Sequence, residues 1–391
     1  MKKLVFVVQR YGVEVNGGAE QHCRMLAERL VDFFDVTVLT TCALEYDTWE
    51  NFYNEGEEII NGVKVRRFKV DFRRDNYEFD ILSSKVFADP KNLNLGLNWI
   101  EKQGPYSTGL FEELKVLDGE VDCFIFFTYL YAPSFFGTDC ISKSKKFLVP
   151  LAHDEKPLYL RIYDDFFNKF DGLIFNTDAE KRLLERRCGS LVDNIVVGVS
   201  VDFPGEIGFK NRRAKEKFSL ENYCLYAGRL DEAKGVSEMI GNFQKFKEVY
   251  KNDLKLVLIG RGNVDIPKTD DIIYLGFVDE MDKWDLIFDS KVFLIPSYFE
   301  SLSLVLLESF YCGKPVLVNG ACEVLKDHCL NSNAGLYYDN VYEFIESMNY
   351  LNNLSYLEME NFSNNAKKYV KENYDWEVIF DKIYKFIKKE Y

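Results

Sequence analysis

The sequence predicts an α/β protein built from two facing domains, each with a doubly wound, Rossmann-like parallel sheet. The chain of 391 residues is longer than one ordinary hydrophobic core requires. Short apolar runs, typical of parallel strands covered on both faces, alternate with helical segments along most of its length. This alternation is interrupted once, at residues 203–219, and then resumes. Two consecutive series of this kind favour two domains.

The first series contains seven apolar runs that we expect to form strands. A helix from Gly18 to about Phe33 follows the first run, and Asn61-Gly62 is a turn signal before the third. After the sixth run, we expect Asp178 to cap a helix that ends near Gly189. The seven runs are 4–8, 36–40, 63–68, 123–128, 147–151, 173–175 and 195–199.

The second series begins after a linker that contains Pro204, Gly205 and Gly208 and a basic stretch, 210–217. Helical segments again separate the apolar runs, so a second parallel sheet is expected. Its strands are predicted at 223–226, 256–259, 272–275, 292–295 and 316–318.

The end of the chain, residues 340–391, is predicted to be helical throughout. Its last helix, 376–389, carries a stripe of apolar side chains on a basic background. An ordinary packed surface helix explains this stripe, and a membrane-surface or partner helix is the alternative. We place the first domain at 1–204, with the helix 375–391 crossing back to it, and the second domain at 205–374.

The segment 72–118 lacks clear periodicity and is predicted to be an irregular, functional insertion. Basic side chains precede it between Lys64 and Arg74. A solvated strand face explains them. Attraction to anionic lipid or to a phosphorylated acceptor is the alternative.

Composition excludes several classes of protein. The net charge of −14 argues against nucleic acid as a partner, because phosphate neutralisation needs clustered cations. Nine scattered cysteines without a CxxC pair fit reduced thiols in the cytoplasm. Cys322, His328 and Cys329 do not have the spacing of a usual zinc site. The first apolar run is too short for a signal peptide and no run reaches membrane-spanning length, so any membrane contact is expected to be peripheral, at the inner face.

The most informative segment runs from Pro296 to Val318. Ser303 is expected to cap a helix that begins at Leu304, and the free N–H groups of Ser301, Leu302 and Ser303 suit a diphosphate. Glu300 precedes that helix and Glu308 lies on it, so two carboxylates flank the expected anion site.

This Glu-x7-Glu segment, followed by Gly-Lys-Pro-Val, resembles the retaining glycosyltransferases of family four, which have the two-domain GT-B fold. The resemblance covers nearly the whole chain and is weakest at 42–120. It implies that Glu300 contacts the donor sugar near its third hydroxyl and that Glu308 binds the nucleotide ribose.

A second segment, LYAGRLDEAKGV at 225–236, places Arg229 and Lys234 across a turn near a helix start. Two cations there suit a diphosphate, although either alone is more often a solvated surface residue. The family has a similar segment. The resemblance implies that both side chains bind the diphosphate and stabilise charge on the leaving group.

Weaker signals lie elsewhere. Gly17 and Gly18 form part of an Asn-Gly-Gly-Ala-Glu loop that resembles the family's contact with the donor phosphate and the acceptor. His153 follows a strand and by resemblance hydrogen-bonds the donor sugar, although a lone His is usually structural. By the same resemblance, Gly260 lies near the nucleotide, and the backbone of Phe277 and Val278 meets the base.

These observations lead to a hypothesis of function. A retaining hexosyltransferase would transfer a sugar from a nucleotide-diphosphate donor, with UDP favoured by family frequency, to a glycan or lipid-linked acceptor on the first domain in surface polysaccharide synthesis. No metal or other cofactor is expected, because Arg229 and Lys234 supply the positive charge. The alternatives are a nucleotide-sugar epimerase or a phosphorylase on the same fold, and a non-catalytic nucleotide-sugar-binding scaffold.

Overall fold

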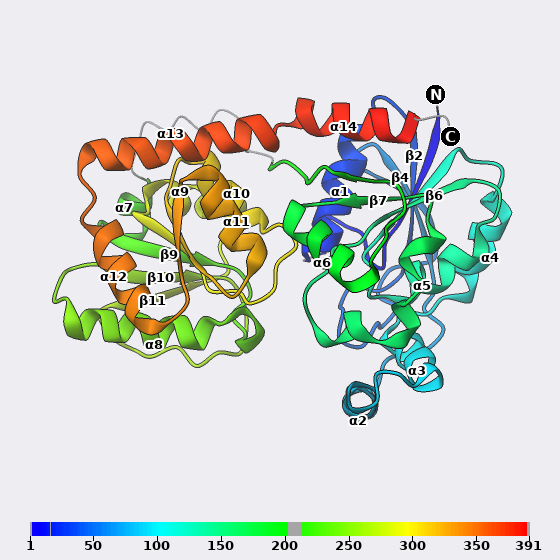
Figure 1. Cartoon of the computed structure of the whole chain (residues 1–391), viewed down its shortest axis with the longest axis horizontal. Helices are drawn as coiled ribbons and strands as arrows, with labels where there is room; N and C mark the ends of the chain where they lie inside the picture. Colours follow the sequence, from blue (N-terminus) through cyan, green and yellow to red (C-terminus); the bar gives the residue numbers. More distant parts are fainter. Residues whose placement is uncertain (1, 16, 202–212, 389–391) are drawn as a thin grey trace. The chain divides into compact units, whose positions relative to one another are not determined.

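The computed structural model describes residues 2–15, 17–201 and 213–388. The chain forms two compact units, Met1–Val199 with Phe380–Tyr391, and Ser200–Ile379 (Figure 1). The predicted linker and the predicted boundary at residue 204 fall largely on residues 202–212, which lie outside the described residues.

The first unit contains an eight-stranded sheet in the order β3-β4-β2-β1-β5-β6-β7-β8. All neighbouring strands are parallel except β3 and β4. The predicted alternation of apolar runs and helices is confirmed. The strands are β1 (Lys3–Val7), β2 (Asp35–Thr41), β3 (Gly56–Ile60), β4 (Val63–Phe68), β5 (Cys123–Phe127), β6 (Lys145–Val149), β7 (Gly172–Phe175) and β8 (Asn194–Val196).

The antiparallel edge strand β3 was not predicted, because its sequence GEEII has one apolar end and exposed carboxylates. It joins β4 through Asn61 and Gly62, whose φ angles of 49° and 83° are those of a tight hairpin turn. The carboxylates of β3 pair with the basic side chains of β4: Arg67 with Glu58 and Arg66 with Glu57. Both arginines therefore have carboxylate partners within the sheet, and Arg67 is buried.

The helices of the first unit flank this sheet (Figure 1). The predicted irregular insertion at 72–118 is wrong, because three helices occupy it. Asp75, Asn92 and Ser107 cap them through their side chains. The helices are α1 (Gly18–Leu30), α2 (Asn76–Ala88), α3 (Leu93–Gln103), α4 (Thr108–Leu117), α5 (Ala132–Gly137) and α6 (Asp178–Cys188), with short 3₁₀ helices η1 (Thr138–Cys140), η2 (Lys156–Tyr159), η3 (Arg161–Tyr163) and η4 (Phe167–Lys169).

The second unit contains a fully parallel six-stranded sheet in the order β11-β10-β9-β12-β13-β14. Its first five strands were predicted and β14 was not. The strands are β9 (Tyr223–Ala227), β10 (Lys255–Ile259), β11 (Ile272–Gly276), β12 (Val292–Ile295), β13 (Val316–Asn319) and β14 (Gly335–Tyr338).

The helices of this unit lie in two groups, with α8 and α12 together and α9, α10 and α13 together (Figure 1). None of the helices among the described residues is long and apolar enough to cross a membrane. The helices are α7 (Arg213–Phe218), η5 (Glu232–Lys234), α8 (Val236–Val249), α9 (Glu280–Asp289), α10 (Leu304–Tyr311), α11 (Glu323–Ser332), α12 (Val341–Asn352) and α13 (Tyr356–Asn373).

The last helix, α14 (Trp376–Lys388), contributes its final turns to the first unit. The ring of Phe380 lies 4.3 Å from that of Phe33, and the ring of Phe386 lies 5.5 Å from that of Phe147, between centroids. A side chain at Gly172 would collide with Phe386. The apolar stripe of this helix is therefore occupied by packing within the protein.

Candidate functional site

The loop between β12 and α10 contains the first predicted carboxylate, Glu300. Its side chain is mostly buried, and its Oε1 atom lies 2.7 Å from Nζ of Lys234. Lys234 ends the 3₁₀ helix η5 after β9, and its backbone N–H donates to the Asp231 carboxylate at 2.9 Å. Two residues that are far apart in the sequence, both predicted from it, therefore form one ion pair at the carboxyl ends of neighbouring strands.

The loops that carry this pair are in direct contact. Gly235, with φ of +70°, follows Lys234, and a Cβ atom there would lie 2.5 Å from the carbonyl oxygen of Pro296. Asn319, the last residue of β13, donates its side-chain N–H to the same carbonyl oxygen, at a distance of 3.1 Å. Because only glycine fits at 235, the close approach of the two loops is encoded in the Lys-Gly sequence.

The start of α10 departs from the prediction in one respect. Ser303 is the N-cap residue as expected, but its backbone is left-handed, with φ of 72°, and its side chain makes no cap hydrogen bond. Its buried hydroxyl makes no hydrogen bond with any described residue. The first turn of the helix is therefore not closed by its cap side chain. The preceding Ser301 is half-buried and Leu302 is buried.

His328, which the sequence associated with a doubtful zinc site, instead supports this loop. Its Nε2 atom lies 2.9 Å from the carbonyl oxygen of Leu302, and its Nδ1 atom lies 3.0 Å from the hydroxyl of Tyr369. Burial lowers the pKa of His328 to about 4, so the ring is neutral at neutral pH. Both ring nitrogens are engaged in positioning the loop.

The second predicted carboxylate, Glu308, is buried on α10. Its Oε1 atom lies 2.7 Å from Nζ of Lys283 on α9, which also pairs with Glu280 at 2.8 Å. Burial raises the pKa of Glu308, and the ammonium of Lys283 opposes this shift. The other oxygen, Oε2, makes no hydrogen bond with any described residue.

Arg229 is the more exposed of the two predicted diphosphate-binding cations, with 58% of its side chain accessible. Its Nε atom lies 3.6 Å from Asp231, the residue that caps η5. Tyr226 donates its hydroxyl to the Arg229 carbonyl at 2.6 Å, which holds the turn. Arg229 and Lys234 thus share a short turn that is organised by Asp231.

The predicted nucleotide-side glycine, Gly260, is required by packing. A Cβ atom there would overlap the carbonyl oxygen of Gly228, and one at Gly262 would overlap that of Leu230. The loops after β9 and β10 therefore touch through their backbones, as Leu230 and Gly262 also form a bridge.

Phe277 and Val278 follow β11 at the same edge of the sheet. Phe277 is 59% exposed, and the guanidinium of Arg261 lies 4.6 Å from its ring centre. Val278 is half-buried. Sequence analysis did not select Arg261, although it sits between the two glycines of the Gly-x-Gly loop.

The glycine loop of the first unit surrounds a buried ion pair. Asn16 lies outside the described residues. Oε1 of Glu20 accepts from Nε of Arg10 at 2.8 Å and from Nη2 of Arg10 at 2.6 Å, and both side chains are almost fully buried. A Cβ atom at Gly17 would overlap the Glu20 carboxylate, whereas one at Gly18 would meet open space. Gly17 therefore has a structural reason to be glycine.

His153 follows β6 and is about one-third exposed, with Nδ1 3.6 Å from Oε1 of Glu155. Glu180, near the start of α6, contacts this loop. Its carboxylate accepts the N–H groups of Ala152 and Asn176, each at 2.7 Å. Burial raises the pKa of Glu180 to about 7, and these N–H donors oppose the shift. Glu180 thus connects the loops after β6 and β7.

The same helix corrects a further prediction. Thr177, not Asp178, caps α6, because its hydroxyl accepts the N–H of Glu180 at 3.1 Å. Sequence analysis also missed Lys283, Arg10 and Glu180 as parts of the site's framework. No local pattern selects these three residues, because their partners Glu308, Glu20 and Ala152 lie in other segments.

Comparisons with known proteins find a family match for part of the chain. Residues 209–369 match the family described as Glycosyl transferases group 1. An uncharacterized glycosyltransferase of Methanocaldococcus jannaschii is 27% identical over 234 residues, which cover 54% of this chain and 56% of that protein. The matches to curated relatives span about a third to about half of the length of those proteins.

Solved structures match over the whole chain. Sucrose-phosphate synthase from Thermosynechococcus elongatus has a TM-score of 0.71 and 14% identity, covering 99% of this chain and 98% of that one. Anabaena HepE in complex with UDP and glucose has a TM-score of 0.71 and 15% identity, covering 99% of both chains. These likenesses show that the fold is GT-B. The family match shows that residues 209–369 resemble a glycosyltransferase domain of group 1.

Proposed function

We propose that this protein is a retaining glycosyltransferase that moves a hexose from a nucleotide-diphosphate sugar to a glycan or lipid-linked acceptor. The observation that carries the proposal is the ion pair between Lys234 and Glu300, at 2.7 Å, in the part of the chain that matches the group 1 family. A cation for the diphosphate and a carboxylate for the sugar hydroxyls are adjacent there, as the transfer requires.

The diphosphate would be bound by Arg229, Lys234 and the N-terminus of α10. The backbone N–H groups of Ser301 to Ser303 precede that helix, and the Ser303 side chain does not satisfy the helix N–H groups. Unsatisfied N–H groups at a helix start favour anions. The packing of the loops through Gly228, Gly235 and Gly260 positions these groups before the donor binds.

The nucleotide would be held at the other side of α10. The unpartnered Oε2 atom of Glu308 can accept a hydrogen bond from a ribose hydroxyl, while Lys283 keeps the carboxylate in place. The backbone at Phe277 and Val278 would meet the base. We favour UDP, which is the nucleotide bound in the HepE structure.

Catalysis would be electrostatic. Arg229 and Lys234 stabilise the charge that develops on the departing diphosphate, so the chemistry does not require a metal or another cofactor. No residue has been assigned as a carboxylate nucleophile. Retention at the anomeric carbon then follows from attack on the same face as the leaving group, with that phosphate accepting the acceptor's proton.

The first unit would bind the acceptor, and His153 would hydrogen-bond the donor sugar. The glycine loop at Gly17 and Gly18 would contact the donor phosphate. A role in surface polysaccharide synthesis, with the protein in the cytoplasm or peripheral to the inner face of the membrane, is part of the proposal and rests on family resemblance.

The test is a set of nucleotide sugars and free diphosphates measured by thermal shift on the wild type, Lys234→Met and Glu308→Ala. A ligand that binds only the folded state at a hundredfold excess over its Kd adds about 2.7 kcal/mol of stability. We expect one nucleotide series to stabilise the wild type and neither variant. Lys245→Met, an exposed lysine on α8, is the control and should respond as the wild type does.

A second measurement follows the product by NMR with and without acceptor. Transfer with retained anomeric configuration supports the proposal, whereas an inverted product contradicts the retaining mechanism. Conversion of the donor without acceptor would indicate an epimerase. Binding without any turnover would indicate a scaffold.

A further inference from the structure

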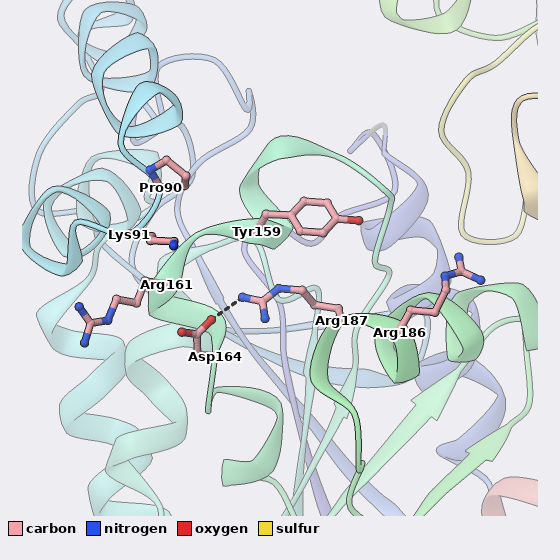
Figure 2. A pocket seen from close by; sticks show the side chains of 7 residues that line it. All are labelled: Pro90, Lys91, Tyr159, Arg161, Asp164, Arg186 and Arg187. Atoms are coloured by element: carbon pink, nitrogen blue, oxygen red, sulfur yellow. Dashed lines mark hydrogen bonds and ion pairs between the residues drawn. The ribbon is translucent and has the colours of Figure 1, made fainter.

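A cavity of about 480 Å³ lies in the first unit, outside all the residues assigned above. Three segments form it: the turn between α2 and α3, the 3₁₀ helices η2 and η3 with the residue that follows, and the last turn of α6 (Figure 2). Its volume falls in the range of small-ligand sites. The lining residues are Pro90, Lys91, Tyr159, Arg161, Asp164, Arg186 and Arg187.

The walls of this cavity are joined by hydrogen bonds. The backbone N–H of Arg161 donates to the carbonyl oxygen of Pro90 at 2.9 Å, which ties η3 to the α2–α3 turn. Arg187 donates through Nε to the carbonyl oxygen of Leu158 at 3.0 Å and pairs with Asp164 at 2.6 Å. The same guanidinium therefore ties α6 to η2 and η3. These hydrogen bonds fix the positions of the segments that line the cavity.

The charge of the lining is opposite to that of the chain. Four cations line the cavity against one carboxylate, Asp164, which already pairs with Arg187, although the whole chain carries −14. Cations are common in the last turn of a helix, which accounts for Arg186 and Arg187. It does not account for Lys91 and Arg161, which come from other segments.

The side chains of Lys91 and Arg161 are exposed and make no hydrogen bond or ion pair with another residue that the structure describes. Figure 2 shows Arg187 between Tyr159 and Asp164, with Arg161 and Arg186 pointing to opposite sides of the view. The cations are thus spread along the cavity instead of converging on one point. A ligand with several separated negative charges suits this arrangement better than a single phosphate ion.

The aromatic residue that lines the cavity, Tyr159, indicates that the ligand contains sugar rings as well as negative charges. Tyr159 is 48% exposed, so one part of its ring can pack against the C–H groups of a sugar. Its hydroxyl donates to Asp154, the neighbour of His153. The segment 153–164 therefore runs directly from the proposed sugar-binding histidine to the cavity.

We propose that this cavity binds an acidic sugar chain, so that the acceptor is an anionic glycan whose carboxylate or phosphate groups pair with Lys91 and Arg161. This inference rests on the proposed function, because it takes the first unit as the acceptor side. The reacting end of the chain would lie toward His153, and the following sugars would occupy the cavity.

The experiment measures binding to the full chain by calorimetry at low and at high ionic strength. The probes are a tetrasaccharide that contains glucuronic acid, its neutral carboxyl-reduced form, a phosphorylated mannose oligosaccharide, and phosphatidylcholine vesicles that contain phosphatidylglycerol. The variant is Lys91→Gln with Arg161→Gln. The matched control, Lys115→Gln with Lys143→Gln, removes the same charge from exposed sites outside the cavity.

We expect one acidic oligosaccharide to bind and the neutral form to bind more weakly, with affinity falling at high salt. The Lys91/Arg161 variant should raise its Kd roughly threefold to thirtyfold, as two solvent-exposed ion pairs allow, and the control variant should leave it unchanged. Comparison of the carboxylate and phosphate probes identifies the anionic group.

Failure of both acidic oligosaccharides to bind, or equal binding to the Lys91/Arg161 variant, would overturn this inference. Vesicle binding that depends on Lys91 and Arg161, without sugar binding, would instead assign the cavity to a membrane surface. Stabilisation by the nucleotide donor is measured on the same samples. If the donor still stabilises every variant, only the acceptor inference fails. If no nucleotide stabilises the wild type, the proposed function itself is refuted.

Discussion

The two units use buried carboxylates for different purposes. In the first unit, Glu20 accepts two hydrogen bonds from Arg10 through Oε1, and Glu180 accepts a backbone N–H with each of its oxygens. In the second unit, Glu300 and Glu308 each pair with one lysine, and Glu308 keeps an oxygen without a hydrogen bond to any described residue. The comparison separates carboxylates that accept from an arginine or from backbone N–H groups from carboxylates that pair with a lysine at the proposed donor site.

The largest effect on stability is expected from Glu20→Gln. It leaves the buried Arg10 guanidinium without its countercharge, and removing one partner of a buried ion pair costs about 3–5 kcal/mol. Urea unfolding measures this loss. Glu28→Gln on the same helix, whose carboxylate lies 3.9 Å from Arg24 and is partly exposed, should cost less than about 1 kcal/mol. Equal losses for the two variants would remove the distinction between the units.

Lys234→Met should lower turnover strongly and change the free energy of unfolding little, unlike Glu20→Gln. Loss of a charge that stabilises the leaving group lowers kcat roughly 10²–10³-fold, while the partly exposed ion pair contributes only about 1 kcal/mol or less to folding. Donor turnover and urea unfolding are measured on the same preparation. A large loss of stability with normal turnover would assign Lys234 to the structural group, with Glu20 and Glu180.

Gly260→Ala tests the contact between the loops of the second unit. The new Cβ atom would overlap the Gly228 carbonyl, and the φ of +133° disfavours alanine, so we expect a loss of about 1–3 kcal/mol. Gly241→Ala is the matched control on α8, because its Cβ atom would meet nothing within 4 Å. There a helix-interior glycine becomes alanine, and a gain of about 0.5–1 kcal/mol is expected. The difference is read from thermal or urea unfolding.

The last prediction concerns the pH dependence that Glu180 gives to stability. Its pKa is raised from 4.5 to about 7 by burial, so the folded protein holds this proton more tightly than the unfolded chain does. Stability from this group is present below pH of about 4.5 and is lost as the pH rises through about 7. Glu180→Gln should abolish this slope and cost about 1 kcal/mol or more, because its amide group faces an N–H donor.

Urea unfolding at a series of pH values measures this slope. A wild type whose stability rises across the same interval would mean that the N–H donors outweigh burial. In that case the pKa of Glu180 is lowered instead, and the carboxylate is a stronger link between the two loops than we infer.

The strands that are covered on both faces were predicted from the sequence, because a continuous apolar run such as β12 or β5 can be recognised without knowledge of its neighbours. It missed β3 and β14, which lie at or near sheet edges and have mixed composition. It also misread α2 as irregular, since only Val86 among its residues is buried and the helix therefore has almost no apolar stripe. Its cap, Asp75, was the available signal.

The sequence by itself determined the α/β order, the two series of strands and the Glu300 to Gly313 segment, because those signals lie within a few residues of one another. The tertiary structure decided the pairs: Lys234 with Glu300, Lys283 with Glu308, and Glu180 with Ala152 and Asn176. It also assembled the basic cavity from three separate segments. Such contacts depend on strand register and helix packing, which bring distant side chains within hydrogen-bonding distance, and no local pattern encodes them.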